Sequence, residues 1–222
     1  MKTTNIIALL LFMLTLAACG DSQETAKPSV TTEVQTQSAT QAQPETSDTT
    51  KLSNGSSLDS VLVTCSACHS GNGIATNPEW PNLAGQNVDY LALQLREFRD
   101  GKRANALMAQ SLLSGFSDQD LNVIASHYSQ LPPVTADGSS SSDVRDLPGA
   151  HVRARCVSCH GMTGNTVTSA WPNIAGQNAA YTAKQLRDYK SGARNNPIMS
   201  VIANELTDQQ IIDVAEYYQS AK

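Results

Sequence analysis

The strongest constraint on this chain is an internal repeat, because the sequence aligns with itself when it is shifted by 91 residues. CSACH at 65–69 falls on CVSCH at 156–160, and WPNLAGQN at 80–87 falls on WPNIAGQN at 171–178. Self-similarity at a fixed offset indicates a fold built from two copies of one unit. Each copy is roughly 75 to 80 residues long, a size at which a hydrophobic core is marginal by itself.

Composition places the boundaries of the two copies. We expect domains at 58–131 and 148–222, joined by a polar linker at 132–147 that is rich in Pro, Gly and Ser. Residues 19–57 contain no aromatic side chain and very few large aliphatic ones. Such a segment cannot bury enough surface to offset its ordering entropy, so we expect a disordered tether there.

Residues 1–18 are typical of a secretory signal, with a lysine followed by an apolar run too short to span a membrane. The run ends in Leu-Ala-Ala before Cys19, which resembles the cleavage box of bacterial lipoproteins. An ordinary signal peptidase site is the alternative, but a stray thiol is unusual in an exported protein. We therefore expect a periplasmic protein that a lipid on Cys19 anchors to a bacterial membrane surface.

The charge excludes one class of partner. The chain has 15 Lys and Arg against 20 Asp and Glu, a net charge of −5, which argues against nucleic-acid binding. Residues 55–131 hold seven acids and four bases, whereas residues 147–222 hold five acids and seven bases. This asymmetry either orients the protein on a charged partner or reflects drift between duplicated halves.

The periodicity predicts an all-α fold. In each copy we expect a short helix that carries the CxxCH stretch. A second helix is expected over 88–99, and its counterpart over about 179–189. A third helix should begin after Ser117 and after Thr207, which are followed at the third position by Asp120 and Gln210 in capping-box spacing. No segment has the alternating pattern of a strand.

The repeated trio of two cysteines and a histidine indicates covalent haem. On a helix these positions share one face, so two thiols can hold a flat ring while the imidazole reaches its central metal. A zinc site would need a fourth ligand, yet His127 and His151 do not repeat. A thioredoxin-like motif would need a βαβ setting, and a plain disulfide would not explain the histidine. The cysteines expected to attach two haems c are Cys65, Cys68, Cys156 and Cys159.

The axial ligands should repeat with the motif. His69 and His160 are the expected ligands on one side of each iron. Met108 and Met199 each lie 43 residues after the first cysteine of their copy, and Met162 has no counterpart. A single methionine is usually core filler, but a pair at this offset predicts the second ligand. A neutral thioether ligand raises the reduction potential.

Further repeated residues are expected around each haem. The carbonyls of Pro81 and Pro172, 12 residues after each histidine, are expected to accept the imidazole Nδ1–H. Asn105 and Asn196 are expected to donate to the methionine sulfur. Contacts with haem propionates are expected from Trp80, Trp171, Arg103 and Arg194, although tryptophans often only pack and arginines are often only solvated.

These motifs together resemble the class I cytochromes c, and most closely the dihaem cytochrome c4 group, over 58–131 and 148–221. The resemblance implies two tandem helical haem-binding domains related by a pseudo-two-fold axis, with the haems near their interface. It implies His/Met ligation by His69 with Met108 and by His160 with Met199. The chain departs from the group at Ser70, where the second copy has Gly161, so the first loop is expected to differ.

The resemblance also implies a function: a carrier of single electrons in a periplasmic respiratory chain, not an enzyme. Its expected partners are redox proteins such as a quinol-oxidising complex, a dehydrogenase or a terminal oxidase. The alternatives are a dihaem oxidoreductase, of the peroxidase or thiosulfate-oxidising type, and a cytochrome relay subunit of a dehydrogenase. An enzyme would need an open iron, which the paired methionines argue against.

Overall fold

The computed structural model describes residues 51–108, 110–134 and 144–221. The expected signal segment, Cys19 and most of the expected tether lie outside these ranges. The described residues are helical, and their β structure is limited to an isolated bridge between Lys51 and Ser57. None of their helices has the length and apolarity that a membrane span requires.

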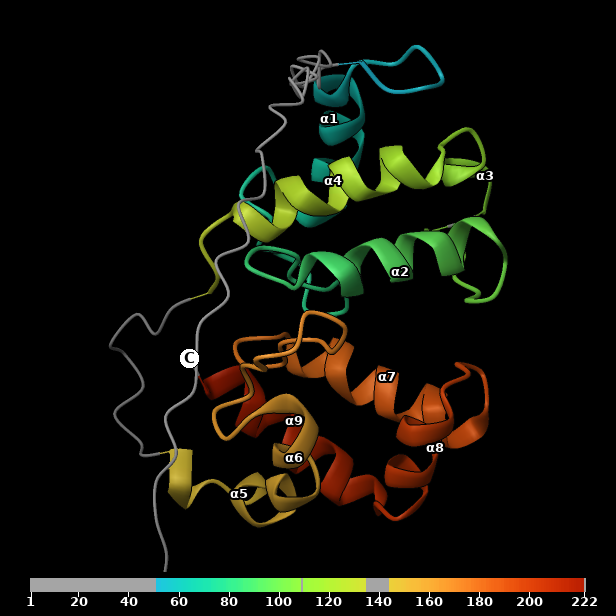
Figure 1. The fold of residues 1–222 in the computed structure, drawn as a ribbon. Coiled ribbons are helices and arrows are strands. Elements are labelled where there is room, and N and C mark those ends of the chain that lie inside the picture. Colours follow the sequence, from blue (N-terminus) through green and yellow to red (C-terminus); the bar gives the residue numbers. More distant parts are fainter. Residues whose placement is uncertain (1–50, 109, 135–143, 222) are drawn as a thin grey trace, which may run out of the picture. The chain divides into compact units, whose positions relative to one another are not determined.

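The first copy contains four helices (Figure 1), α1 (Leu58–His69), α2 (Val88–Arg99), α3 (Gln110–Leu113) and α4 (Asp118–Gln130). Helix α2 packs along α4, and the apolar face of each helix enters one core. Leu121, Ile124, Ala125 and Tyr128 are at most 3% exposed, as the i, i+3, i+4, i+7 spacing predicts for a buried helical stripe.

The second copy repeats this plan, but short segments replace the single helix α1. Its elements are η1 (Val144–Asp146), α5 (Gly149–Val152), η2 (Arg153–Arg155), α6 (Val157–His160), α7 (Ala179–Ser191), α8 (Pro197–Asn204) and α9 (Asp208–Ser220). Helix α9 packs against both α5 and α7. A Cβ on Gly149 would lie 2.1 Å from the carbonyl oxygen of Asp213, so the lack of a side chain there permits the close approach of α5 to α9.

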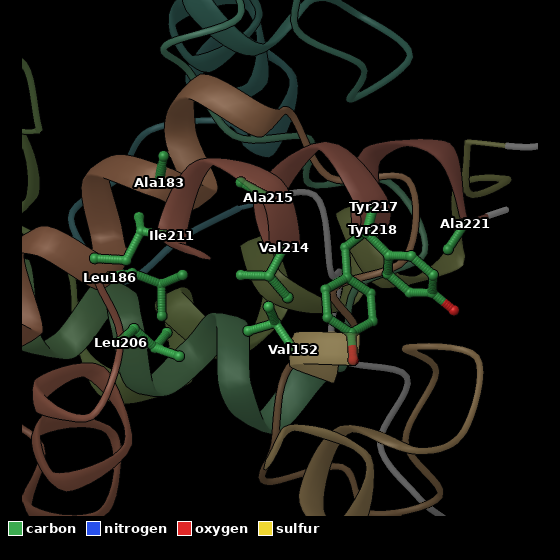
Figure 2. Close-up of a cluster of buried hydrophobic side chains, with 10 residues drawn as sticks. All are labelled: Val152, Ala183, Leu186, Leu206, Ile211, Val214, Ala215, Tyr217, Tyr218 and Ala221. Carbon is green, nitrogen blue, oxygen red and sulfur yellow. The ribbon is translucent and has the colours of Figure 1, made fainter. Parts of the chain in front are cut away.

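Figure 2 shows the core of the second copy, where Val214 lies beside Val152 from α5, and Ile211 and Leu206 lie around Leu186 from α7. Tyr218 is 1% exposed, as its counterpart Tyr128 is almost fully buried in the first copy. Each copy thus has a core of its own, made from its last helix and the two helices that cross it.

Several expected elements agree with the structure. Helix α2 has the expected bounds, and α7 extends two residues beyond its expected end. Ser117 and Thr207 both cap their helices in full capping boxes. The CxxCH stretches end α1 in one copy and form α6 in the other. Helix α8 was not expected, although Asn196 followed by Pro197 is a strong N-cap signal.

The start of the first domain differs from the expected boundary at residue 57. Leu52 is 5% exposed, and the backbone N–H and hydroxyl of Ser53 both donate to the carboxylate of Asp120 at the start of α4. The first domain therefore begins several residues before the expected boundary. The burial of Leu52 and the hydrogen bonds of Ser53 attach residues 51–57 to it. A similar difference concerns the linker, since Val144 and Leu147 pack against the second core.

Ser70 adopts the same kind of backbone as its glycine counterpart. Its φ of 62° and ψ of 159° resemble the φ of 80° and ψ of 161° at Gly161, and Ser70 is the one non-glycine residue with positive φ among the described residues. The turn after the motif histidine therefore has the same shape in both copies, contrary to the expected difference, and Ser70 holds backbone strain in the first copy.

We predict that Ser70→Gly stabilises the protein by about 1 kcal/mol, because glycine adopts this backbone without strain. The reciprocal change Gly161→Ser should destabilise it, since a Cβ there would lie 2.1 Å from the carbonyl oxygen of Asn165. Denaturant unfolding of the haem-loaded protein measures both. Equal or lower stability of Ser70→Gly would contradict the assignment of strain.

A second prediction concerns Asp120, which is 4% exposed. Burial raises the pKa of Asp120, but hydrogen bonds from Ser53 and Ser117 outweigh burial and lower it from 3.8 to about 2. A carboxylate with a depressed folded pKa stabilises the fold above its unfolded pKa and loses this effect as the pH falls through the folded value. Asp120→Asn should therefore cost about 1–2 kcal/mol at pH 7 and progressively less between pH 4 and 2.

Urea unfolding at a series of pH values tests this prediction. The exposed Glu216, on α9, supplies the control, and Glu216→Gln is expected to change the unfolding free energy at pH 7 by less than about 0.5 kcal/mol. A pH-independent cost of Asp120→Asn would mean that the carboxylate acts through shape alone.

Candidate functional site

Both CxxCH motifs open into one cavity of about 830 Å³. Its walls carry all of the expected haem-attaching and axial residues, namely Cys65, Cys68, His69, Met108, Cys156, Cys159, His160 and Met199. The lining is mainly apolar side chains from both copies, among them Leu91, Phe98 and Leu186. The cavity is therefore positioned to hold flat apolar groups against the cores of both domains.

The two histidines are held in the same way. The Nδ1 atom of His69 lies 3.0 Å from the carbonyl oxygen of Pro81, and that of His160 lies 2.9 Å from the carbonyl oxygen of Pro172. Both imidazoles are buried, at 6% and 8% exposure. Burial lowers the pKa of each histidine, while the proline carbonyl opposes this. A neutral imidazole that donates through Nδ1 leaves the Nε2 lone pair free to bind a metal.

All four motif cysteines have free thiols at intermediate exposure. Burial raises the pKa of the Cys65 and Cys156 thiols above its ordinary value. Thiolate chemistry, as in a redox CxxC or a zinc site, needs the opposite shift. The described residues also contain no group of three or more His, Cys, Asp and Glu side chains arranged to hold a metal ion.

The methionines lie on the cavity wall, each fixed by an asparagine three residues earlier. The side-chain oxygen of Asn105 accepts the backbone N–H groups of Leu107 and Met108, and Asn196 does the same for Ile198 and Met199. These bonds use the amide oxygens and leave the amide nitrogens for the expected contact with sulfur. Met162 is 66% exposed and is absent from the cavity lining.

The donor set fits covalent haem in each domain. Two cysteines, a neutral imidazole with a free Nε2 and a thioether line the same apolar cavity, and they do so twice. In this arrangement the cysteines would hold the ring through thioether bonds, while His and Met would supply axial ligands. The buried macrocycles would also supply apolar area that a chain with 5% aromatic residues lacks.

The repeated WPNxAGQN stretch joins the two domains, a role that the sequence analysis did not find. The side chain of Gln177 accepts the backbone N–H of Asn82 at 2.8 Å and donates to its carbonyl at 2.9 Å. Gln86 makes the same pair of bonds to Asn173, at 2.8 Å each. The sequence feature that could have indicated this role is the glutamine that recurs at the same position of both stretches, Gln86 and Gln177.

The tryptophans belong to this interface as well. The carbonyl oxygen of Trp80 accepts the amide of Asn178 at 2.7 Å, and that of Trp171 accepts the amide of Asn87 at 2.6 Å. Both tryptophans also line the cavity, as do Arg103 and Arg194. A contact between these four side chains and propionates remains a prediction.

The comparisons with known proteins agree with the geometry. The family model described as Cytochrome c matches residues 148–222. The cytochrome c4 of Pseudomonas aeruginosa is 35% identical over 168 residues, which cover 70% of this chain and 82% of that protein. The chain belongs to the cytochrome c4 family. It is accordingly a dihaem c-type cytochrome of electron transfer, with two haems c as cofactors.

A solved cytochrome c4 structure and a second curated relative extend the comparison. The solved structure of cytochrome c4 from Acidithiobacillus ferrooxidans is 27% identical with a TM-score of 0.63, covering 71% of this chain and 98% of that one. A thiosulfate dehydrogenase electron acceptor from Stutzerimonas stutzeri is 29% identical over 189 residues, which cover 79% of this chain and 87% of that protein. The fold of two tandem cytochrome c domains is thereby confirmed.

We predict that Gln177→Leu destabilises this cytochrome by about 1–3 kcal/mol, because it leaves the buried N–H and carbonyl of Asn82 without their partner. Urea unfolding followed at the haem band measures the effect. Gln209→Leu, on the exposed face of α9, is the matched control and should cost less than about 0.5 kcal/mol. Equal effects of the two changes would show that the amide pair does not hold the domains together.

Proposed function

We propose that this cytochrome carries single electrons in a bacterial periplasmic respiratory chain, with both irons ligated by histidine and methionine. His69 and Met108 would ligate one iron, and His160 and Met199 the other. The observation that carries the proposal is the twofold occurrence of a buried imidazole bound through Nδ1 to a proline carbonyl in a cavity that a methionine also lines. A single site of this kind could arise from packing alone. Two such sites, at positions related by the 91-residue repeat, indicate a function retained in both copies.

Two protein ligands on each iron determine what the site can do. When bound, haem supplies a reversible one-electron couple, and a thioether ligand favours the reduced iron and so raises its potential. With both axial positions filled, no substrate reaches the metal. The chain's own contribution is to fix the imidazoles through Pro81 and Pro172, to seat the methionines through Asn105 and Asn196, and to exclude water with its apolar walls.

The expected partners are other redox proteins, for example a quinol-oxidising complex, a dehydrogenase or a terminal oxidase. A lipid on Cys19 would keep the carrier at the membrane surface, with residues 19–50 as the tether between lipid and first domain. The described helices contain no span, which is compatible with this arrangement.

A second candidate is the role of electron acceptor to a thiosulfate dehydrogenase. Relatives from Stutzerimonas stutzeri and Thiomonas intermedia carry that name, at 29% and 32% identity. The haem chemistry of the carrier would be the same, and only the donor would differ. A chain that oxidised thiosulfate itself would need an open iron, so ligation separates the carrier from the enzyme.

An optical redox titration with and without carbon monoxide tests the proposal. We predict two low-spin one-electron steps at positive potential that carbon monoxide does not move, because an iron with two strong ligands has no open position. Met199→His should lower one of the two potentials and leave the other nearly unchanged. Met162→His is the control, since this exposed methionine lies outside the cavity lining.

The outcomes separate the candidates. A step that shifts under carbon monoxide would reveal an open iron and favour the oxidoreductase alternative. If Met199→His left both potentials as they are, Met199 would not be a ligand.

A further inference from the structure

Two arginines from different domains share the same pair of glutamine acceptors. Arg103 donates to the side-chain oxygen of Gln94 in its own domain at 2.6 Å and to that of Gln185 in the other domain at 2.7 Å. Arg194 donates to Gln185 at 2.9 Å and to Gln94 at 2.7 Å. The four side chains close a ring across the interface, which we call the Arg–Gln ring.

The ring brings two positive charges together. Because both guanidinium groups bind the same oxygen, their nitrogens lie closer than twice a hydrogen-bond length. Arg194 is only 6% exposed, and Arg103 is half-buried. Among the described residues no carboxylate forms an ion pair with either arginine. A buried cation beside a half-buried one, with no carboxylate to pair with either, is costly, so the arrangement favours the binding of anions.

The tyrosine and glutamine side chains around the ring have unused hydrogen-bond donors, because their oxygen atoms already accept bonds from the arginines. Tyr181 accepts a hydrogen bond from Arg103 through its hydroxyl oxygen, and Tyr90 accepts one from Arg194, each at 3.0 Å. The phenol protons and the glutamine amide N–H groups have no acceptor among the described residues. Burial raises the pKa of Tyr181, yet the nearby charges of Arg103 and Arg194 outweigh burial and lower it. The ring therefore presents a positive, donor-rich surface.

This surface faces the haem cavity. Both arginines, both glutamines and both tyrosines belong to the cavity lining. The guanidinium groups also stack on aromatic rings, Arg103 on Phe98 at 4.5 Å and Arg194 on Tyr189 at 4.6 Å. The stacking fixes each guanidinium plane, so that its unused N–H groups are held in place.

We propose that the Arg–Gln ring seats a propionate carboxylate from each haem and that each arginine thereby sets the potential of both haems, its own and that of the other domain. The inference rests on the proposed function, because it requires one redox-active haem in each domain. A positive charge beside a haem disfavours the oxidised iron, which carries one more charge than the reduced one, so each arginine raises both potentials.

The alternative is that each arginine acts only in its own domain or serves only as a structural bracket. Arg103→Gln and Arg194→Gln distinguish these cases in an optical redox titration of the haem-loaded protein. We expect each single change to lower both midpoint potentials by about 59 mV, which corresponds to a tenfold change in the equilibrium constant of a one-electron reduction. The exposed Arg187, on α7, is the matched control, and Arg187→Gln should lower either potential by less than a third of that amount.

The results that overturn the proposal are specific. Movement of a single step by each arginine change would show that the arginines act within their own domains. If the potentials shift no more than they do in Arg187→Gln, the ring would have only a structural role and would not set the haem potentials. Dependence of the parent's potentials on phosphate, at constant ionic strength, would show that the ring binds a solution anion instead of propionates. All three readings hold only while carbon monoxide leaves the parent spectrum unchanged, which tests the proposed function separately.

If a charge-removing variant does not retain both haems, Tyr181→Phe and Tyr90→Phe supply the same test with a smaller perturbation. Each removes one donor beside the ring and keeps the ring charges, so both potentials should fall by a smaller amount. A change in one step alone would again contradict the proposal.

Discussion

The hydrogen bonds between the two WPNxAGQN stretches are the interaction on which the rest of the structure depends. In the first copy Pro81 lies between Trp80, whose carbonyl binds Asn178, and Asn82, whose backbone binds Gln177. The carbonyl of Pro81 in turn holds the imidazole of His69. The same few residues therefore attach one domain to the other and orient the His69 imidazole, the proposed iron ligand. A shift of the interface would move the carbonyl that holds this histidine, so domain docking and the orientation of the imidazole are coupled.

The interface is made by uncharged amides, and this has an energetic consequence. Each amide pair exchanges bonds to water for bonds to protein, which stabilises only modestly per bond. Removal of one partner, by contrast, leaves a buried donor and acceptor unsatisfied and costs more. Such an interface contributes specificity of register more than strength, because only one alignment satisfies Gln86 and Gln177 together. A fixed register is what two haem sites need if the distance between them is to stay constant.

The sequence was sufficient wherever the signal is local. Apolar spacing predicted α2 at its observed bounds, and Ser117 with Asp120 predicted the start of α4. The two haem cofactors were predicted from a motif of five adjacent residues, and covalent attachment at those residues stays a prediction. The sequence was insufficient where the partner is distant along the chain: nothing local in Gln177 marks Asn82, 95 residues away, as its partner. The early start of the first domain was missed for the same reason, because the burial of Leu52 depends on a fold that closes around it.

The differences between the copies separate what the fold tolerates from what the function requires. One copy has strained Ser70 where the other has Gly161, and one capping box titrates through Asp120 where the other uses the neutral Gln210. These differences lie in turns and caps, where each domain absorbs the cost alone. Among the residues that face the cavity or cross the interface, several are identical in the two copies: Pro81 and Pro172, Gln86 and Gln177, Gln94 and Gln185, and Arg103 and Arg194. An arginine withdrawn from water without a carboxylate partner is unfavourable for stability. The presence of one at the same place in both domains, buried in one and half-buried in the other, is explained if the cofactors, rather than the fold, require the charge.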